Sequence, residues 1–161
     1  MLKFKMDDID HQILQILIEN CRTPFTEIAK KLLVSAGTVH IRVKKMEDQG
    51  VIKGSTLVID YEKMGYTFIA YVGLYTGNSN FSSKIIDDIK KIPEVTVAHL
   101  TTGQFSVYCK IRAKNTKHAK EVIFKLSNID GVGRTESSIS LEEVINDKKR
   151  LMRSIFNDNG K

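Results

Sequence analysis

The order of hydrophobic patterns from residue 66 onward constrains the fold of this 161-residue chain more than any other feature. Apolar residues run continuously or alternate where strands are expected, and they recur every three to four positions where helices are expected. The resulting order is strand, helix, strand, strand, helix, strand. These elements cover residues 68–75, 81–92, 94–102, 105–113, 115–126 and 132–143. The pattern predicts an antiparallel sheet with both helices on one face.

This order is that of the split βαβ, or ferredoxin-like, arrangement. The two middle strands form the simplest hairpin around the turn at residues 102–104. We expect Leu100 to pair with Val107 and Ala98 to pair with Cys109, with these four side chains facing the helices.

The opposite face of the expected sheet has no helix to cover it. On this reading Val95, Val97 and Tyr108 lie on the open face, beside alternate residues of the first strand. An exposed apolar patch on a small domain predicts association, most simply a symmetric dimer joined sheet to sheet.

The first fifty residues have the spacing of three short helices, followed by an extended segment at residues 51–60. Three acids between Asp7 and Asp10 stand at the positive end of the first helix dipole. Thr23 with Pro24, and later Ser35, are typical helix starts, and Gly50 is a typical helix end.

The second and third helices are joined by a tight turn, with the small Ala29 where they would cross. This spacing is typical of a helix-turn-helix, whose second helix enters the DNA major groove. Such a turn usually contains a glycine with positive φ, and Leu33 stands there instead. The left-handed conformation of a leucine costs about 1 kcal/mol.

The formal net charge of +6, from 25 Lys and Arg against 19 Asp and Glu, is unevenly distributed. The segment between residues 20 and 54 contains seven basic residues and three acidic ones. The basic ones are Arg22, Lys30, Lys31, Arg42, Lys44, Lys45 and Lys53. Such a patch favours nucleic acid as a partner, although a solvated basic helix pair without a ligand has the same pattern.

Short motifs along nearly the whole chain resemble the Lrp/AsnC, or feast/famine, regulators. The matching segments are Asp7–Asp10, Asn20–Arg22, Glu27–Ala29, Val34–Val39, Arg42–Glu47, Gly50–Gly54, Met64–Tyr66, Pro93–Val95, Thr101–Ser106 and Gly131–Glu136. The resemblance is strongest to the asparagine-responsive AsnC branch. It implies an α+β protein with a winged helix-turn-helix followed by a ferredoxin-like βαββαβ domain, also called a RAM or ligand-binding domain.

The expected domains follow from this resemblance and from the patterns. A DNA-binding domain covers residues 1–54, a linker strand or hinge 55–65, the effector-binding and oligomerisation domain 66–145, and a basic tail 146–161. The tail is either a docking helix or a frayed end.

The candidate DNA-binding residues lie mostly on and around the third helix, off its buried stripe. They are Arg22, Ser35, Gly37, Thr38, His40, Arg42, Lys44, Lys45 and Lys53. These residue types suit phosphate contacts and base edges. A two-fold dimer predicts a pseudo-palindromic duplex site with half-sites about one helical turn apart, or a multiple of it.

The resemblance also implies an amino-acid effector, bound where dimers meet in larger assemblies, often octamers. The candidate effector-binding residues are Thr101, Thr102, Gly103, Gln104, Phe105, Ser106, Thr135, Glu136, Ser137 and Ser138. Backbone N–H groups near Gly103 suit a carboxylate, and Glu136 suits an ammonium group. Ser106 stands where the family more often has an aspartate, which separates this chain from the leucine-type regulators. The resemblance to the AsnC branch implies asparagine as the effector.

Other functions receive little support from the sequence. Cys21 and Cys109 form no metal-ligand spacing, and we expect both to be buried free thiols in a reducing compartment. No acid, base or metal cluster suggests an enzyme, and we expect no cofactor. We expect a cytoplasmic, nucleoid-associated location, because no apolar run has the length of a bilayer span. The alternatives are an architectural DNA-binding protein without effector response, and an enzyme or metabolite-binding module on the ferredoxin-like half.

Overall fold

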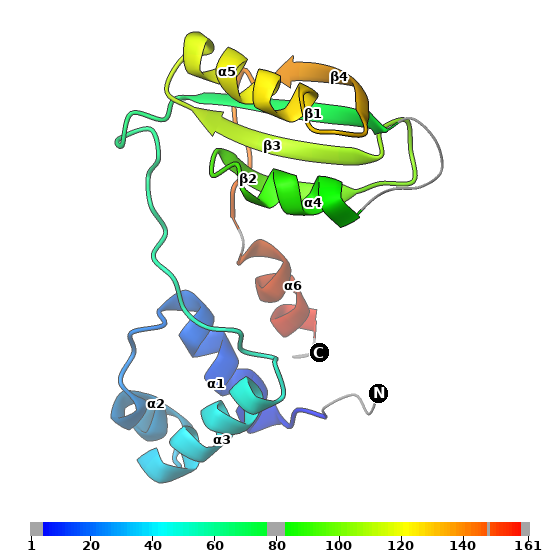
Figure 1. The fold of residues 1–161 in the computed structure, drawn as a ribbon. Helices are drawn as coiled ribbons and strands as arrows, with labels where there is room; N and C mark the ends of the chain where they lie inside the picture. Colours follow the sequence, from blue (N-terminus) through cyan, green and yellow to red (C-terminus); the bar gives the residue numbers. More distant parts are fainter. Residues whose placement is uncertain (1–4, 77–82, 148, 159–161) are drawn as a thin grey trace. The chain divides into compact units, whose positions relative to one another are not determined.

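The computed structural model describes residues 5–76, 83–147 and 149–158 and divides into two compact units (Figure 1). The sheet unit comprises Ile59–Val144, and the helical unit comprises Met1–Val58 together with Ile145–Lys161. The C-terminal residues from Ile145 onward therefore group with the helical unit and not with the sheet unit. None of the helices in these described ranges has the length and apolar composition needed to cross a bilayer.

The sheet unit has the predicted ferredoxin-like topology. Its elements are β1 (Phe68–Thr76), α4 (Ser83–Lys90), β2 (Val95–Leu100), β3 (Val107–Ala113), α5 (Thr116–Ser127) and β4 (Val132–Ile139). The strands are antiparallel in the order β2-β3-β1-β4. Consecutive strand residues point to opposite faces. Residues of the strands and of both helices form one buried cluster, so one face of the sheet packs against both helices.

The core of the sheet unit lies on this helix face. Alternate strand residues and one stripe from each helix meet there without exposure to solvent. The fully or almost fully buried side chains include Ala70, Val72, Leu74, Val107, Cys109, Ile111, Ile85, Ile89, Val122 and Leu126.

The hairpin has the predicted register at its centre. Leu100 pairs with Val107 and Ala98 pairs with Cys109. Val107 and Cys109 are fully buried, whereas Leu100 stays 62% exposed because β2 is an edge strand.

The position of Val95 differs from the prediction. We expected Val95 on the open face, but a register shift between Val95 and Val97 places it opposite Ile111, where it packs on the helix-face core. A bulge of this kind inserts one residue and reverses which face the preceding side chain occupies. Val97, 41% exposed, is on the open face as predicted.

The helical unit contains α1 (Asp8–Glu19), α2 (Phe25–Leu32), α3 (Ala36–Asp48) and α6 (Arg150–Asp158). Ser35 caps α3 as predicted, since its Oγ accepts from the Thr38 N–H at 3.0 Å. Thr23 is not the cap of α2: its Oγ1 donates to the Asn20 carbonyl at 2.8 Å, and Pro24 occupies the cap position. The core contains Ile13, Leu14, Ile28, Ala29, Val39, Val43 and Met46.

The segment after α3 carries no strand. We expected residues 51–60 to be extended strand, but they have no regular secondary structure, and residues 61–65 form a turn. In that turn Met64 and Gly65 donate backbone hydrogen bonds to Tyr61 and Glu62 at 3.1 and 2.8 Å. Residues 51–60 make no strand ladder, although the Val51 and Ile52 N–H groups donate to the Met46 carbonyl at 2.9 and 3.2 Å and Ile52 packs against the core of the helical unit.

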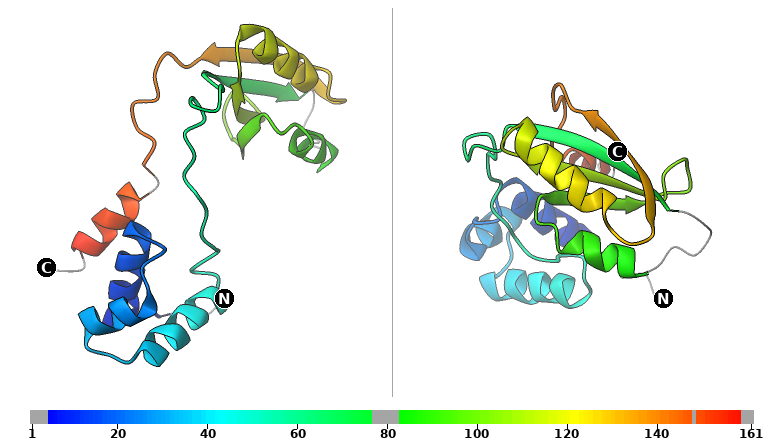
Figure 2. Two further views of the ribbon diagram at one scale, coloured as in Figure 1. Left: turned by 90° about the vertical axis from the view of Figure 1, so that its left-hand side faces the viewer. Right: turned by 45° about the horizontal axis from the view of Figure 1, so that its top comes forward.

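The C-terminal helix α6 packs against α1 within the helical unit, as Figures 1 and 2 show. Met152 and Phe156 lie against the core of the helical unit. The Arg153 guanidinium pairs with both carboxylate oxygens of Glu19 at 2.6 and 2.9 Å. Of the two alternatives for the tail, the structure shows the docking helix.

Leu33 adopts the left-handed conformation that its place in the tight turn predicts. Its φ and ψ are 55° and 39°, and it is the one non-glycine residue with positive φ among the described residues. The side chain is 93% exposed, so packing contributes little that offsets the backbone strain.

We expect Leu33→Gly to increase the free energy of unfolding by about 0.5–1 kcal/mol, because glycine adopts this conformation without a Cβ clash. Leu33→Ala is the matched control, since it removes the same side chain but keeps the Cβ. Urea denaturation followed by circular dichroism measures both. Equal stability of the two variants would contradict a strained backbone at this position.

Candidate nucleic-acid interface and effector site

Five exposed residues of α3 lie on the side of the helix that faces away from the core of the helical unit. Gly37, His40, Ile41, Lys44 and Lys45 are exposed, opposite the buried stripe of Val39, Val43 and Met46. Lys44 also pairs with Asp48 at 2.8 Å, one turn later on the helix. The structure therefore brings four predicted DNA-binding residues together on one face of the helix. Ile41, which was not predicted, lies between them.

The start of α3 carries two further predicted residues. The hydroxyl groups of Ser35 and Thr38 share a hydrogen bond of 2.8 Å. Ser35, the N-cap residue, stays exposed at the positive end of the helix dipole. Arg22 and Lys53 are exposed in the segments that flank α2 and α3. All four lie at the ends of helices or in the adjoining turns, where phosphate contacts commonly arise.

Arg42 is not part of this exposed face. Its Nη1 pairs with Asp7 and with Asp10, each at 2.7 Å, and the Asp10 residue is only 3% exposed. The pKa of the Asp7 carboxyl lies below its usual value because the Asp10 backbone N–H donates to it, as does Arg42. Arg42 thus joins α3 to the start of α1. The sequence reading assigned the acids only to the helix dipole and missed this ion-pair cluster.

The open face of the sheet unit carries a row of aromatic rings, which we call the aromatic row: Tyr71, Tyr108, Phe105 and Tyr75. The rings of Tyr71 and Tyr108 stack with their centroids 5.9 Å apart, and those of Tyr108 and Phe105 stack with their centroids 5.4 Å apart. Phe105 meets Tyr75 edge to face at 5.1 Å. Pairs of this geometry are favourable beyond the area they bury. The predicted apolar open face is therefore largely aromatic.

The loop between β2 and β3 is folded onto the end of β1. The Ser106 N–H donates to the Leu74 carbonyl at 2.9 Å, and the Ser106 hydroxyl lies 2.7 Å from the Thr76 hydroxyl. Gln104 Nε2 donates to the Tyr75 hydroxyl at 2.6 Å. Ser106 and Gln104 therefore anchor the loop.

The tip of this loop has available backbone donors. Within the described ranges, none of the N–H groups of Thr102, Gly103 and Gln104 donates to a backbone carbonyl. A Cβ at Gly103 would meet nothing within 4 Å, so the backbone there is open to close approach. Adjacent N–H groups in an open turn suit a carboxylate.

The candidate residues on β4 do not all face this loop. Thr135 and Ser137 pair with Leu74 and Val72 and therefore lie on the helix face, whereas Glu136 and Ser138 lie on the open face. Glu136 forms a close ion pair with Arg134, whose guanidinium lies 4.9 Å from the Tyr75 ring centre. Strand alternation splits the predicted set, and only Glu136 and Ser138 share a face with the aromatic row.

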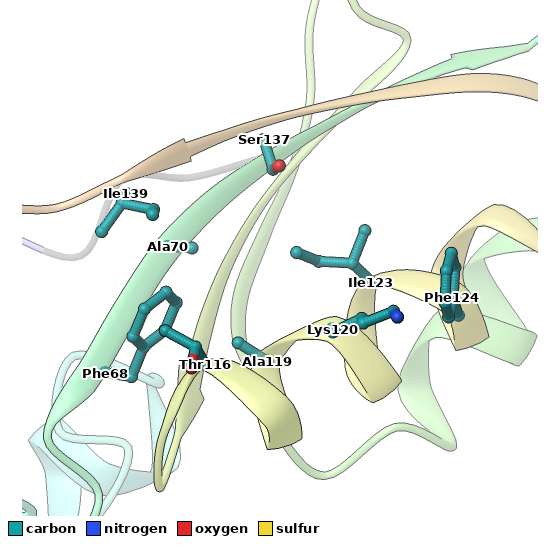
Figure 3. A pocket seen from close by; sticks show the side chains of 9 residues that line it. All are labelled: Phe68, Ala70, Thr116, Ala119, Lys120, Ile123, Phe124, Ser137 and Ile139. Carbon is teal, nitrogen blue, oxygen red and sulfur yellow. The ribbon is translucent and has the colours of Figure 1, made fainter.

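Ser137 instead lines a pocket of about 220 Å³ between α5 and the strands β1 and β4 (Figure 3). Its lining is mostly apolar and includes Phe68, Ile123 and Ile139. The sequence reading did not anticipate this pocket, because it depends on how far α5 reaches across β4.

The arrangement of Cys109 and His99 does not suit nucleophilic catalysis. Cys109 lies on the helix face, and burial raises the pKa of its thiol to about 11. His99 pairs with Tyr108 and lies on the opposite face. Cys21 is exposed, contrary to the expectation that both cysteines are buried. Among the residues that the structure describes, no group of three or more His, Cys, Asp or Glu could hold a metal ion.

Gly73 is required by the aromatic row, because a Cβ at this position would overlap the Phe105 ring. We expect Gly73→Ala to lower the free energy of unfolding by about 1–3 kcal/mol, since the ring must leave the sheet. Chemical denaturation and near-UV circular dichroism measure the loss and the displaced rings. The control is Gly133→Ala, whose added Cβ would meet only the Tyr75 carbonyl oxygen at 3.9 Å. Equal effects of both substitutions would argue against the packing role of Gly73.

Comparison with known domains agrees with both parts of this geometry. A family model described as winged helix-turn-helix DNA-binding matches residues 6–53, and one described as Lrp/AsnC ligand binding domain matches residues 69–149. The helical unit thus contains a DNA-binding domain and the sheet unit a ligand-binding domain, which together define a transcriptional regulator. The chain belongs to the Lrp/AsnC family.

Individual relatives share nearly the whole length of the chain. Regulatory protein AsnC of Haemophilus influenzae is 35% identical over 87% of this chain and 94% of its own length. The Escherichia coli K12 protein of the same name is 31% identical over 90% of this chain and 96% of its own length. The solved structure of E. coli AsnC superposes with a TM-score of 0.86 at 29% identity, covering 90% of this chain and 98% of that one.

Proposed function

We propose that this regulator binds a pseudo-palindromic DNA site as a dimer or higher assembly, and that the amino acid asparagine controls it allosterically. The observation that carries the effector part is the open loop tip at residues 102–104, where three N–H groups adjoin the aromatic row. The similarity to two regulators named AsnC supports asparagine among the amino acids.

The chemistry of the loop suits a free amino acid. Its carboxylate would accept from the N–H groups near Gly103, and its ammonium would approach Glu136 on the open face. The Ser106 hydroxyl bonds to the Thr76 hydroxyl and thereby holds the loop in place. The Glu136 carboxylate also pairs with Arg134, so the effector ammonium would share it with that guanidinium. Binding between dimers would bias assembly, and thereby the spacing of the two α3 helices.

Isothermal titration of the full chain with the twenty amino acids tests the effector. We expect L-asparagine to bind, and Gly103→Ala to weaken binding without loss of stability, because its Cβ has open space around it. The control is Gly133→Ala on β4. Binding of leucine or lysine in place of asparagine would refute the asparagine assignment, and binding unaffected by Gly103→Ala would refute the location.

Assembly through the open face is tested by light scattering after size-exclusion chromatography. The aromatic row and the exposed Val97 form an apolar surface suited to a second copy, with dimers assembling further to octamers. We expect Val97→Glu to shift the wild-type assembly toward monomer. An unchanged mass would place the interface elsewhere.

DNA binding is tested by gel shift with a duplex selected from a random pool, at several salt concentrations. We expect Lys45→Ala to weaken binding and to reduce the slope of log affinity against log salt by about 1. If unrelated DNA competes as well as the selected duplex, and if no amino acid changes DNA binding, the protein is instead an architectural DNA-binding protein.

A further inference from the structure

Ile41 is the exposed aliphatic side chain on the outward side of α3. It lies opposite the buried stripe, and 68% of its surface is exposed. The exposed residues around it on the helix are Gly37, His40, Lys44 and Lys45. A single exposed isoleucine is ordinary on a protein surface, but one that is surrounded by basic residues suits a partner that offers an apolar group within a field of negative charge.

Gly37 lies one turn before Ile41 on the same side of the helix. Its φ is not in the left-handed region, and an added Cβ would meet only the Ser35 Oγ, at an ordinary distance of 3.7 Å. Neither backbone conformation nor internal packing therefore requires glycine here. Glycine weakens a helix relative to alanine, so its presence suggests that another molecule approaches the helix closely at this point.

We propose that Ile41 reads the C5-methyl group of a thymine in the DNA major groove, with Gly37 leaving room for the base edges beside it. This inference rests on the proposed DNA-binding function and adds the base that one side chain recognises. The thymine methyl is the apolar group that the major groove offers, and it distinguishes thymine from cytosine. The phosphates on either side of the groove supply the negative charge that Lys44 and Lys45 face.

The test uses the full chain and a duplex that it selects from a random pool. Each thymine of that duplex is replaced in turn by uracil, which removes only the methyl group. We expect one position in each half-site to lose affinity about fourfold, the equivalent of one buried methyl group. Fluorescence anisotropy at fixed salt measures the ratio of the two affinities.

The variants assign that ratio to a residue. Ile41→Ala is expected to bind thymine and uracil sites equally while its dependence on salt stays that of the wild type. Leu33→Gly is the control, since it removes another exposed aliphatic side chain, in the turn before α3, and should keep the ratio. Gly37→Ala is expected to raise Tm and yet weaken binding severalfold, an outcome that a purely structural role does not produce.

Three results would overturn the inference. Specific, salt-dependent binding with equal affinity for thymine and uracil at every position would refute it and leave the proposed function standing. A ratio that persists in Ile41→Ala would assign the methyl contact to another residue. Absence of any sequence preference would overturn both this inference and specific regulation by the helix-turn-helix.

Discussion

Arg42→Ala is expected to lower the free energy of unfolding of the helical unit by about 2–3 kcal/mol, because the substitution leaves the Asp10 carboxylate buried without its cation. Asp10 is 3% exposed and Arg42 reaches it at 2.7 Å. The same guanidinium also contacts Asp7. Urea denaturation followed by circular dichroism measures the loss. Lys44→Ala is the matched control, since it breaks an exposed pair with Asp48 on the same helix and should change little.

The dependence on pH gives this prediction a second readout. The pKa of Asp7 is lowered in the folded chain, so its contribution to stability is present above its ordinary value of 3.8 and is lost as the pH falls through the lowered one. The difference between wild type and Arg42→Ala should therefore shrink in acid. A difference that stays constant with pH would show that the loss does not come from the Arg42–carboxylate pairs. No loss at neutral pH would show that the ion-pair cluster does not stabilise the fold.

A structural role for Arg42 also predicts its behaviour toward DNA. In cold buffer, where the variant stays folded, Arg42→Ala should keep the salt dependence of wild-type binding, because Arg42 is held by two carboxylates within the chain. A phosphate contact would instead reduce the salt slope by about 1. The sequence pattern alone grouped Arg42 with Lys45, and this measurement separates them.

Removal of α6 by truncation after Asp147 is expected to cost the helical unit about 2 kcal/mol. The helix places the partly buried Met152 and Phe156 against the core of the helical unit, and Phe156 lies 6.2 Å from the His11 ring. The Arg153–Glu19 pair adds orientation and little stability, since both side chains are about half exposed. Denaturation of the truncated chain measures the loss.

Point variants separate packing from simple shortening of the chain. Phe156→Ala should account for much of the loss, whereas Leu151→Ala should cost little because that side chain is 70% exposed on the same helix. Equal effects of the two substitutions would indicate that α6 does not pack through Phe156. A truncated chain as stable as the wild type would contradict the docking of α6.

The elements of the sheet unit were predictable because their signals are local. Strand alternation and the helical stripes determine which side chains share a face, and the pairing of Ala98 with Cys109 follows from them. The separation of Thr135 and Ser137 from Glu136 and Ser138 was also predictable from alternation, but the effector candidates were grouped by sequence neighbourhood. Val95 was not predictable, because a bulge has no clear signal in one sequence.

The sequence by itself determined the order of the elements in the sheet unit, most of their buried faces, the strained turn at Leu33 and the family. Only the tertiary structure decided the roles of Arg42, Val95 and α6. Arg42 and Asp7 are 35 positions apart, and Arg153 and Glu19 are 134 positions apart. Periodicity shows which way a side chain points from its own helix or strand. Which partner it meets depends on how distant elements pack together.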